Sequence, residues 1–186
     1  GLEFTTAVAI GVSLNTVSAI DATVSYTLSG TATGSGTDYT LANGSITIPA
    51  GQITASINLV IVNDTDDELL ETVVLTLSNP IDATLGTNQT FTYTIENDDQ
   101  SAIRFENNNY TDFENGILGP NARIIVVELD KPSPFLVTVN YAVSSATGSE
   151  NTNEAIGGGV DYTLPNGTIT FESGETSKSF TIDIID

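Results

Sequence analysis

Five carboxylates stand within nine residues between positions 63 and 71, where the sequence reads Asn-Asp-Thr-Asp-Asp-Glu-Leu-Leu-Glu. Two carboxylates about 5 Å apart repel each other by roughly 3 kcal/mol at an effective dielectric constant of about 20. A segment this acidic needs either full solvation or a counter-charge. Calcium is a suitable counter-ion because it takes about 6–8 oxygen ligands. The stretch therefore predicts either a calcium-binding loop or a solvated, mobile acidic loop.

The composition of the whole chain narrows the chemistry further. Its 186 residues include 24 acidic and four basic side chains, for a formal charge of −20, and contain no His, Cys, Met or Trp. Catalytic sites built on histidine or cysteine are excluded, as are zinc, copper and haem sites of the usual kind. The charge argues against nucleic acid and anionic membranes as partners, and no run is apolar enough to predict a membrane span. Oxygen-ligated cations fit these residues and would relieve the self-repulsion of the chain.

Strand-like patterns flank the acidic segment and recur along the chain. Apolar and polar residues alternate, or β-branched residues cluster, in residues 8–14, 22–28, 45–48, 53–62, 72–77 and 89–95. Such patterns are typical of half-buried β-strands. The Asn43-Gly44 pair is a hairpin signal just before the short strand over residues 45–48. The sequence predicts an all-β protein in which the acidic segment is a loop between two strands.

The pattern of the first half of the chain returns in the second half. Asp-Tyr-Thr-Leu-x-Asn-Gly occurs at residues 38–44 and again at 161–167, which indicates an internal repeat of about one hundred residues. We expect two domains, over residues 1–99 and 100–186, each incomplete at a chain end. The first lacks a counterpart of the leading strand at 102–105, and the second stops before its own acidic loop and its last two strands. Unpaired sheet edges would then recruit strands from neighbouring chains.

Three motifs in this order resemble the Calx-beta domain of sodium–calcium exchangers, integrin β4 and large bacterial surface proteins. They are Asp-Tyr-Thr at 38–40 with Asn-Gly-Ser-Ile-Thr-Ile-Pro-Ala-Gly at 43–51, the acidic segment running on through Ser-Asn-Pro at 78–80, and Ile-Glu-Asn-Asp-Asp at 95–99. The resemblance covers nearly the whole chain. It implies two tandem immunoglobulin-like antiparallel β-sandwiches, with calcium held where loops converge at one end.

The resemblance also implies a set of calcium ligands. In the first domain these are Glu3, Asp38, Asn63, Asp64, the backbone carbonyl of Asp66, Glu68, Glu71, Asn97, Asp98 and Asp99, and in the second they are Glu114, Asp161 and Asp186. Asn63 and Asn97 stand where the exchanger-type domain has Asp, so we expect fewer ions or weaker binding. The rest of the second site would lie beyond the end of the chain.

The resulting expectation is a non-enzymatic, calcium-binding pair of modules from a larger secreted or cell-surface repeat protein. Calcium would stiffen the loop end and the junction with the next domain, and the partners would be calcium, neighbouring repeat domains and strands of other chains. One alternative is a passive structural or adhesive spacer without functional calcium. Another is a carbohydrate-binding or hydrolytic module, for which the lack of Trp and the total of 13 Phe and Tyr residues are unfavourable.

Overall fold

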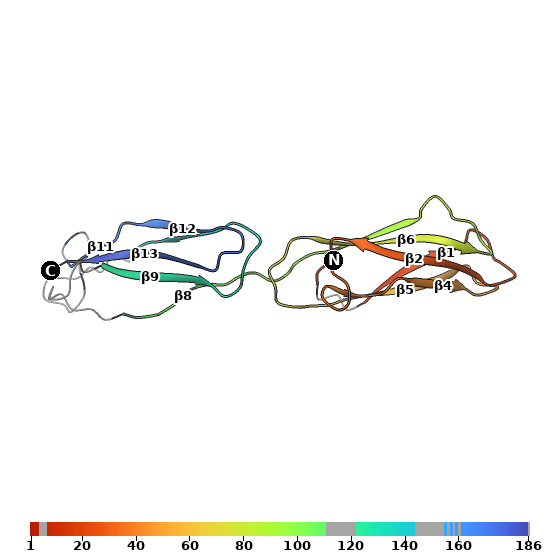
Figure 1. The fold of residues 1–186 in the computed structure, drawn as a ribbon, viewed down its shortest axis with the longest axis horizontal. Coiled ribbons are helices and arrows are strands. Elements are labelled where there is room, and N and C mark those ends of the chain that lie inside the picture. Colours follow the sequence, from red (N-terminus) through yellow and green to blue (C-terminus); the bar gives the residue numbers. More distant parts are fainter. Residues whose placement is uncertain are drawn as a thin grey trace. The chain divides into compact units, whose positions relative to one another are not determined.

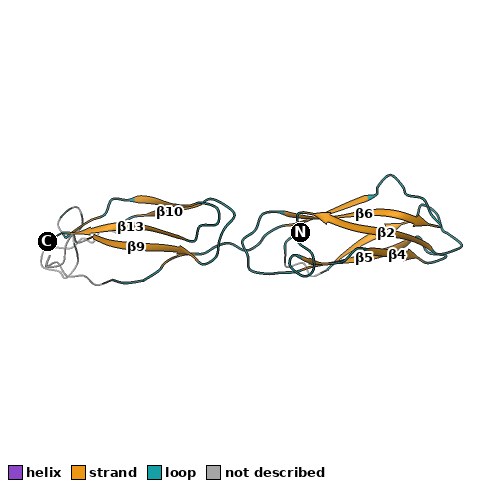
Figure 2. Cartoon of the chain, in the orientation of Figure 1, coloured by secondary structure: helices purple, strands orange, loops and turns teal. Residues whose placement is uncertain are grey.

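The chain folds as two separate units of β-structure, Gly1–Asp99 and Gln100–Asp186. The computed structural model describes residues 1–3, 7–110, 122–143 and 161–185, together with residues 155, 157 and 159. Thirteen strands and no helix occur in these ranges (Figures 1 and 2), so the predicted all-β fold class is confirmed. Accordingly, the described part of the chain contains no helix able to span a membrane. Each unit is described by itself below.

Unit 1 consists of two antiparallel sheets. The smaller sheet has the order β1 (Val8–Ser13), β5 (Thr54–Ile61) and β3 (Tyr39–Thr40). The larger sheet has the order β4 (Gly44–Ile48), β2 (Ala22–Gly30), β6 (Glu71–Ile81) and β7 (Thr90–Ile95). The acidic segment connects β5 to β6, and therefore connects the two sheets, as a loop between two strands.

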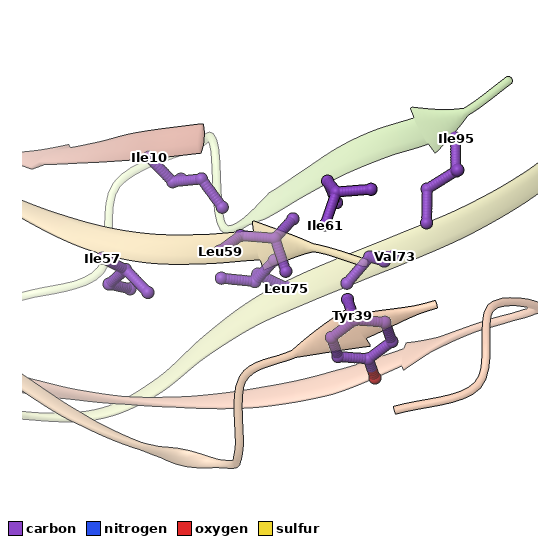
Figure 3. Close-up of a cluster of buried hydrophobic side chains, with 8 residues drawn as sticks. All are labelled: Ile10, Tyr39, Ile57, Leu59, Ile61, Val73, Leu75 and Ile95. Atoms are coloured by element: carbon purple, nitrogen blue, oxygen red, sulfur yellow. The ribbon is translucent and has the colours of Figure 1, made fainter. Parts of the chain in front are cut away.

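The core of unit 1 lies between the two sheets (Figure 3). Alternate residues of β5 are buried, with Ile57 at 5%, Leu59 at 0% and Ile61 at 3% exposure. Val73 and Leu75 of β6 come from the facing sheet and belong to the same cluster. Successive side chains of a strand point to opposite faces, so an alternating sequence buries one face and leaves the other to solvent. Burial of each such side chain contributes roughly 1.5–3 kcal/mol.

The structure does not form the hairpin predicted at Asn43-Gly44, because β3 and β4 belong to different sheets. Instead, Gly44 pairs across the strands with Tyr26, and a side chain at Gly44 would meet the tyrosine ring at about 3 Å. Asn43 accepts a hydrogen bond from the Leu28 amide at 2.7 Å through its Oδ1 atom. The glycine is needed to make room for an aromatic ring rather than to form a tight turn.

Unit 2 repeats this arrangement in its described part. One sheet has the order β11 (Tyr162–Thr163), β13 (Ser177–Ile184), β9 (Ala122–Leu129) and β8 (Ile103–Phe105), and β10 (Val137–Tyr141) pairs with β12 (Gly167–Phe171). The buried core of unit 2 consists of Val127, Leu129, Ile169 and Phe171. Tyr141 lies opposite Gly167, as Tyr26 lies opposite Gly44, and its ring stacks on Phe180 at a centroid distance of 4.2 Å.

Candidate metal centre

The strand registers of unit 1 bring several acidic segments to one end of the sandwich. Glu71 at the start of β6 lies opposite Ile95 at the end of β7, so the run that follows β7 emerges beside the acidic loop. Tyr39 at the start of β3 lies opposite Ile61 at the end of β5, which places Asp38 at the same end of that sheet. Glu3 is fixed there too, because its amide donates to the Glu96 carbonyl at 3.2 Å.

Seven of the predicted side chains form three overlapping groups. Within each group the carboxylate oxygens lie within 4.8 Å of one another; the groups are Glu3 with Asp64 and Glu68, Glu3 with Asp98 and Asp99, and Asp38 with Glu68 and Glu71. Glu3 belongs to two groups and so does Glu68. The three groups are therefore one continuous cluster of oxygens.

Two carboxylates of the cluster are buried, which is unusual for acidic residues. Glu3 is 1% exposed and Asp38 is 2% exposed. Three buried oxygens, Glu3 Oε2, Asp38 Oδ1 and Glu71 Oε2, accept no hydrogen bond from any described residue. An unpaired buried charge is strongly unfavourable, and residues 1–99 contain no Lys, Arg or His to compensate it. The donor set consists entirely of oxygen atoms and fits a hard cation such as calcium.

The electrostatics of the cluster favour protonation when nothing else neutralises it. Burial is the main cause that raises the pKa of Glu3 to about 7, and the negative charges of Asp64, Glu68, Asp98 and Asp99 add to it. The pKa of Glu71 is also raised to about 7, first by burial, then by a hydrogen bond that the protonated carboxyl makes to Asp38, and by nearby charges. Burial, followed by the neighbouring acids, raises the pKa of Glu68 as well.

Backbone hydrogen bonds hold Asp38 in place. The Thr33 amide donates to Asp38 Oδ2, the Asp38 amide donates to the Thr33 carbonyl at 3.0 Å, and the Val62 amide donates to the Asp38 carbonyl at 3.0 Å. One carboxylate oxygen is therefore used to close the turn. The other oxygen, Oδ1, is left for the cluster.

Asn97 connects the two acidic segments. Its side-chain amide donates to Asp67 Oδ1 at 3.0 Å and to the Asp99 carbonyl at 2.8 Å, and its Oδ1 accepts from the Asp99 amide at 3.0 Å. Within the acidic loop, the Asp66 amide donates to Asp64 Oδ1 at 2.8 Å. The sequence analysis did not predict this connection, and no spacing in the sequence indicates it, because residues 67 and 97 meet only through the fold.

The remaining predicted ligands are placed as follows. Asn63 and Asp66, whose backbone carbonyl is the predicted ligand, lie in the acidic loop beside the cluster. The side-chain amide of Asn63 donates to the Asp64 carbonyl at 3.0 Å. Asp161 lies just before β11 of unit 2, and its carbonyl accepts from the Ile185 amide at 2.9 Å, as the Asp38 carbonyl does from Val62. No group of three acids forms around Asp161 in the described part of unit 2. Glu114 and Asp186 lie outside the described residues.

Comparisons with solved structures return chains whose titles name domains of CALX or Calx. The structure titled CBD12 from CALX1.2 has a TM-score of 0.49 and 18% identity, and covers 100% of this chain and 71% of its own. The calcium binding domain CBD12 of CALX1.1 has a TM-score of 0.49, 19% identity and the same coverage. The apo-form Calx CBD1 domain has a TM-score of 0.48 and 26% identity, and covers 53% of this chain and 88% of its own.

Comparisons of sequence give one family. No curated protein matches the chain. The sequence profile of the Calx-beta domain matches it twice, over residues 2–99 and 96–186. Together the two matches span all but the first residue. The chain therefore belongs to the Calx-beta family and carries two copies of its domain.

Proposed function

We propose that unit 1 is a non-enzymatic calcium-binding module. The observation that carries this proposal is the set of three buried carboxylate oxygens that accept no hydrogen bond from a described residue, in a unit that has no Lys, Arg or His. Hydrogen bonds from protein groups satisfy most buried polar atoms in native structures. Cations would supply the missing partners and the missing charge, one beside Glu3 and another beside Asp38 and Glu71.

The spacing of the oxygens suits more than one calcium ion. Two ligands on opposite sides of a calcium ion are about 4.6–5.2 Å apart, because each lies about 2.3–2.6 Å from it. The oxygens of each group lie within 4.8 Å of one another, and Glu3 and Glu68 each belong to two groups. We propose Glu3, Asp38, Asp64, Glu68, Glu71, Asp98 and Asp99 as side-chain ligands, with Glu3 and Glu68 bridging neighbouring ions. Asn63, Asn97 and the Asp66 carbonyl are further oxygens of the same loops.

The consequence of binding would be mechanical rather than catalytic. Ions between Glu3, Asp64 and Asp98 would connect three chain segments at one end of the sandwich. Asp98 and Asp99 are the last residues of unit 1, and Gln100 begins unit 2. Fixing them would shorten the free linker and stiffen the passage into the next module. A secreted or cell-surface location suits this role, since extracellular calcium modules work with dissociation constants of about 10⁻⁴–10⁻³ M.

One observation favours a second candidate, a passive spacer without functional calcium. The Oδ1 atom of Asn97, which stands at a proposed ligand position, already accepts a hydrogen bond from the Asp99 amide. In that case the connection between the two acidic segments would be made by Asn97 itself. The two candidates differ in whether calcium binds stoichiometrically.

The direct test is calorimetric titration of the chain with calcium, compared with two single-charge variants. Glu68→Gln removes a carboxylate shared by two groups and should weaken binding at least about tenfold, or about 1.4 kcal/mol. Asp82→Asn removes the same charge beyond the opposite end of β6 and should leave affinity unchanged. No heat of binding at millimolar calcium would support the spacer instead. Equal losses in both variants would mean that only net charge matters.

A further inference from the structure

Within the described residues, the strand β1 lies at the edge of its sheet and pairs with β5 alone. The Leu14 amide donates to the Ile53 carbonyl at 2.8 Å, and the register continues with Val12 opposite Ala55. Residues of an antiparallel strand alternate between those that bond to one neighbour and those that face the other side. The main-chain N–H and C=O groups that face away from β5 are therefore those of Ala9, Gly11 and Ser13.

Unit 2 shows what the same positions do when a neighbour is present. Leu129 donates to the Thr176 carbonyl on β13 at 2.9 Å, as Leu14 donates to Ile53 on β5. The alternate residues face β8, where the Val126 carbonyl accepts from the Glu106 amide at 3.0 Å and Arg104 pairs with Glu128. Counting back from the two leucines, Gly11 corresponds to Val126 and Ser13 corresponds to Glu128. The edge that β8 covers in unit 2 is paired with no described strand in unit 1.

Nothing in β1 protects this edge. In natural proteins, charged residues, proline or a β-bulge usually prevent an edge strand from pairing with another chain. Val8–Ser13 contains no charged residue and no proline. Its register with β5 is unbroken, so it contains no bulge either. Ala9, Gly11 and Ser13 are all exposed. On the exposed face of β1, no atom of a described residue lies within 4 Å of the place where a side chain at Gly11 would begin. No described strand pairs with β1 on its outer side, so a second strand could bond to these outward groups.

We propose that the outer edge of β1 is an acceptor for an extended strand of the β8 type. Such a strand would run antiparallel to β1. Its central residue would be uncharged or basic and would stand between two apolar residues, as in Ile103-Arg104-Phe105. By the register of β8 on β9, its central residue lies opposite Ser13. The absence of Lys and Arg from residues 1–99 favours a neutral or basic strand over an acidic one. This site is independent of the proposed calcium binding.

The test is hydrogen exchange of the isotope-labelled chain with a synthetic peptide of the sequence of residues 100–106. At about millimolar peptide, we expect the Gly11 and Ser13 amides to exchange at least about tenfold more slowly, while Val12, already bonded to β5, stays unchanged. Gly11→Pro removes an outward N–H without touching the bonds to β5 and should abolish the effect. Gly11→Ala keeps that N–H, meets open space and should behave as the original chain.

A second control needs no change in the protein and so remains valid if Gly11→Pro folds poorly. A peptide N-methylated at its arginine keeps every side chain but loses the N–H that faces the acceptor strand, and it should not protect either amide. Protection by this peptide, or protection of the Gly11→Pro variant, would overturn the proposal. So would the absence of any peptide effect on the original chain. Dimers that form through β1 itself and exclude the peptide would identify a second copy as the occupant instead.

Discussion

Asp38 uses one carboxylate oxygen to accept from the Thr33 amide, and its other oxygen is buried and accepts no hydrogen bond from a described residue. Asp38→Asn keeps an oxygen for Thr33 and removes one negative charge. Without calcium, the variant should be more stable, because repulsion from Glu68 and Glu71 falls; about 1 kcal/mol corresponds to about 4–8 °C in Tm for a domain of this size. Calcium should raise the Tm of this variant by less than it raises the Tm of the original chain. A metal-free variant that melts earlier than the original chain would contradict this.

The titration of Glu3 and Glu71 gives a prediction for pH. Each has a folded-state pKa of about 7 against an ordinary value of 4.5, so between these values the folded state holds more protons than the unfolded state. The stability of the metal-free unit should therefore fall as pH rises from 4.5 to 7, by up to about 1.4 kcal/mol per pH unit for each group. Urea unfolding at several pH values measures the slope. Saturating calcium should abolish or reverse it, whereas a metal-free stability that rises with pH through this range would be inconsistent with the raised pKa values.

At the scale of elements, the sequence predicted the strands better than the connections. Alternation of apolar and polar residues correctly indicated β1, β2 and β5, because burial of one face follows directly from that pattern. The predicted hairpin at Asn43-Gly44 was wrong, since a glycine that accommodates a tyrosine ring has the same local sequence as a turn glycine. The resemblance indicated which acids belong to the candidate site, and their role as ligands stays a prediction. The burial of Glu3 and the connection through Asn97 depend on how distant segments pack, which no local pattern specifies.

The connection between the acidic loop and the run after β7 can be tested through Asn97. Asn97→Asp loses the donor to Asp67, at a cost of about 1 kcal/mol or more, and places a further negative charge beside the cluster. The metal-free form should therefore be less stable than the original chain. Calcium affinity should rise several-fold, because a charged ligand replaces a neutral one. Titration and melting of the same preparation measure both effects, and a variant with unchanged calcium affinity would show that Asn97 acts only as a connection.

At the scale of the whole molecule, the two units differ in charge and in completeness of the acidic cluster. All four basic side chains, Arg104, Arg123, Lys131 and Lys178, lie in unit 2. The three groups of neighbouring acidic side chains found among the described residues all lie in unit 1. Calcium should therefore raise the melting transition of unit 1 by mass action and leave that of unit 2 nearly unchanged. Calorimetric scans with and without calcium, with the transitions assigned by Leu59→Ala in the core of unit 1, measure this. A calcium shift confined to the transition that Leu59→Ala leaves unmoved would contradict the assignment.

Diffraction from crystals grown with calcium, recorded at a wavelength that gives an anomalous signal from the ion, tests the central claim most directly. The account predicts at least two anomalous peaks at the loop end of unit 1, each within about 2.3–2.6 Å of its oxygens, with Glu3 or Glu68 touching more than one. A map in which Glu3, Asp38 and Glu71 remain buried with no peak beside them would contradict it.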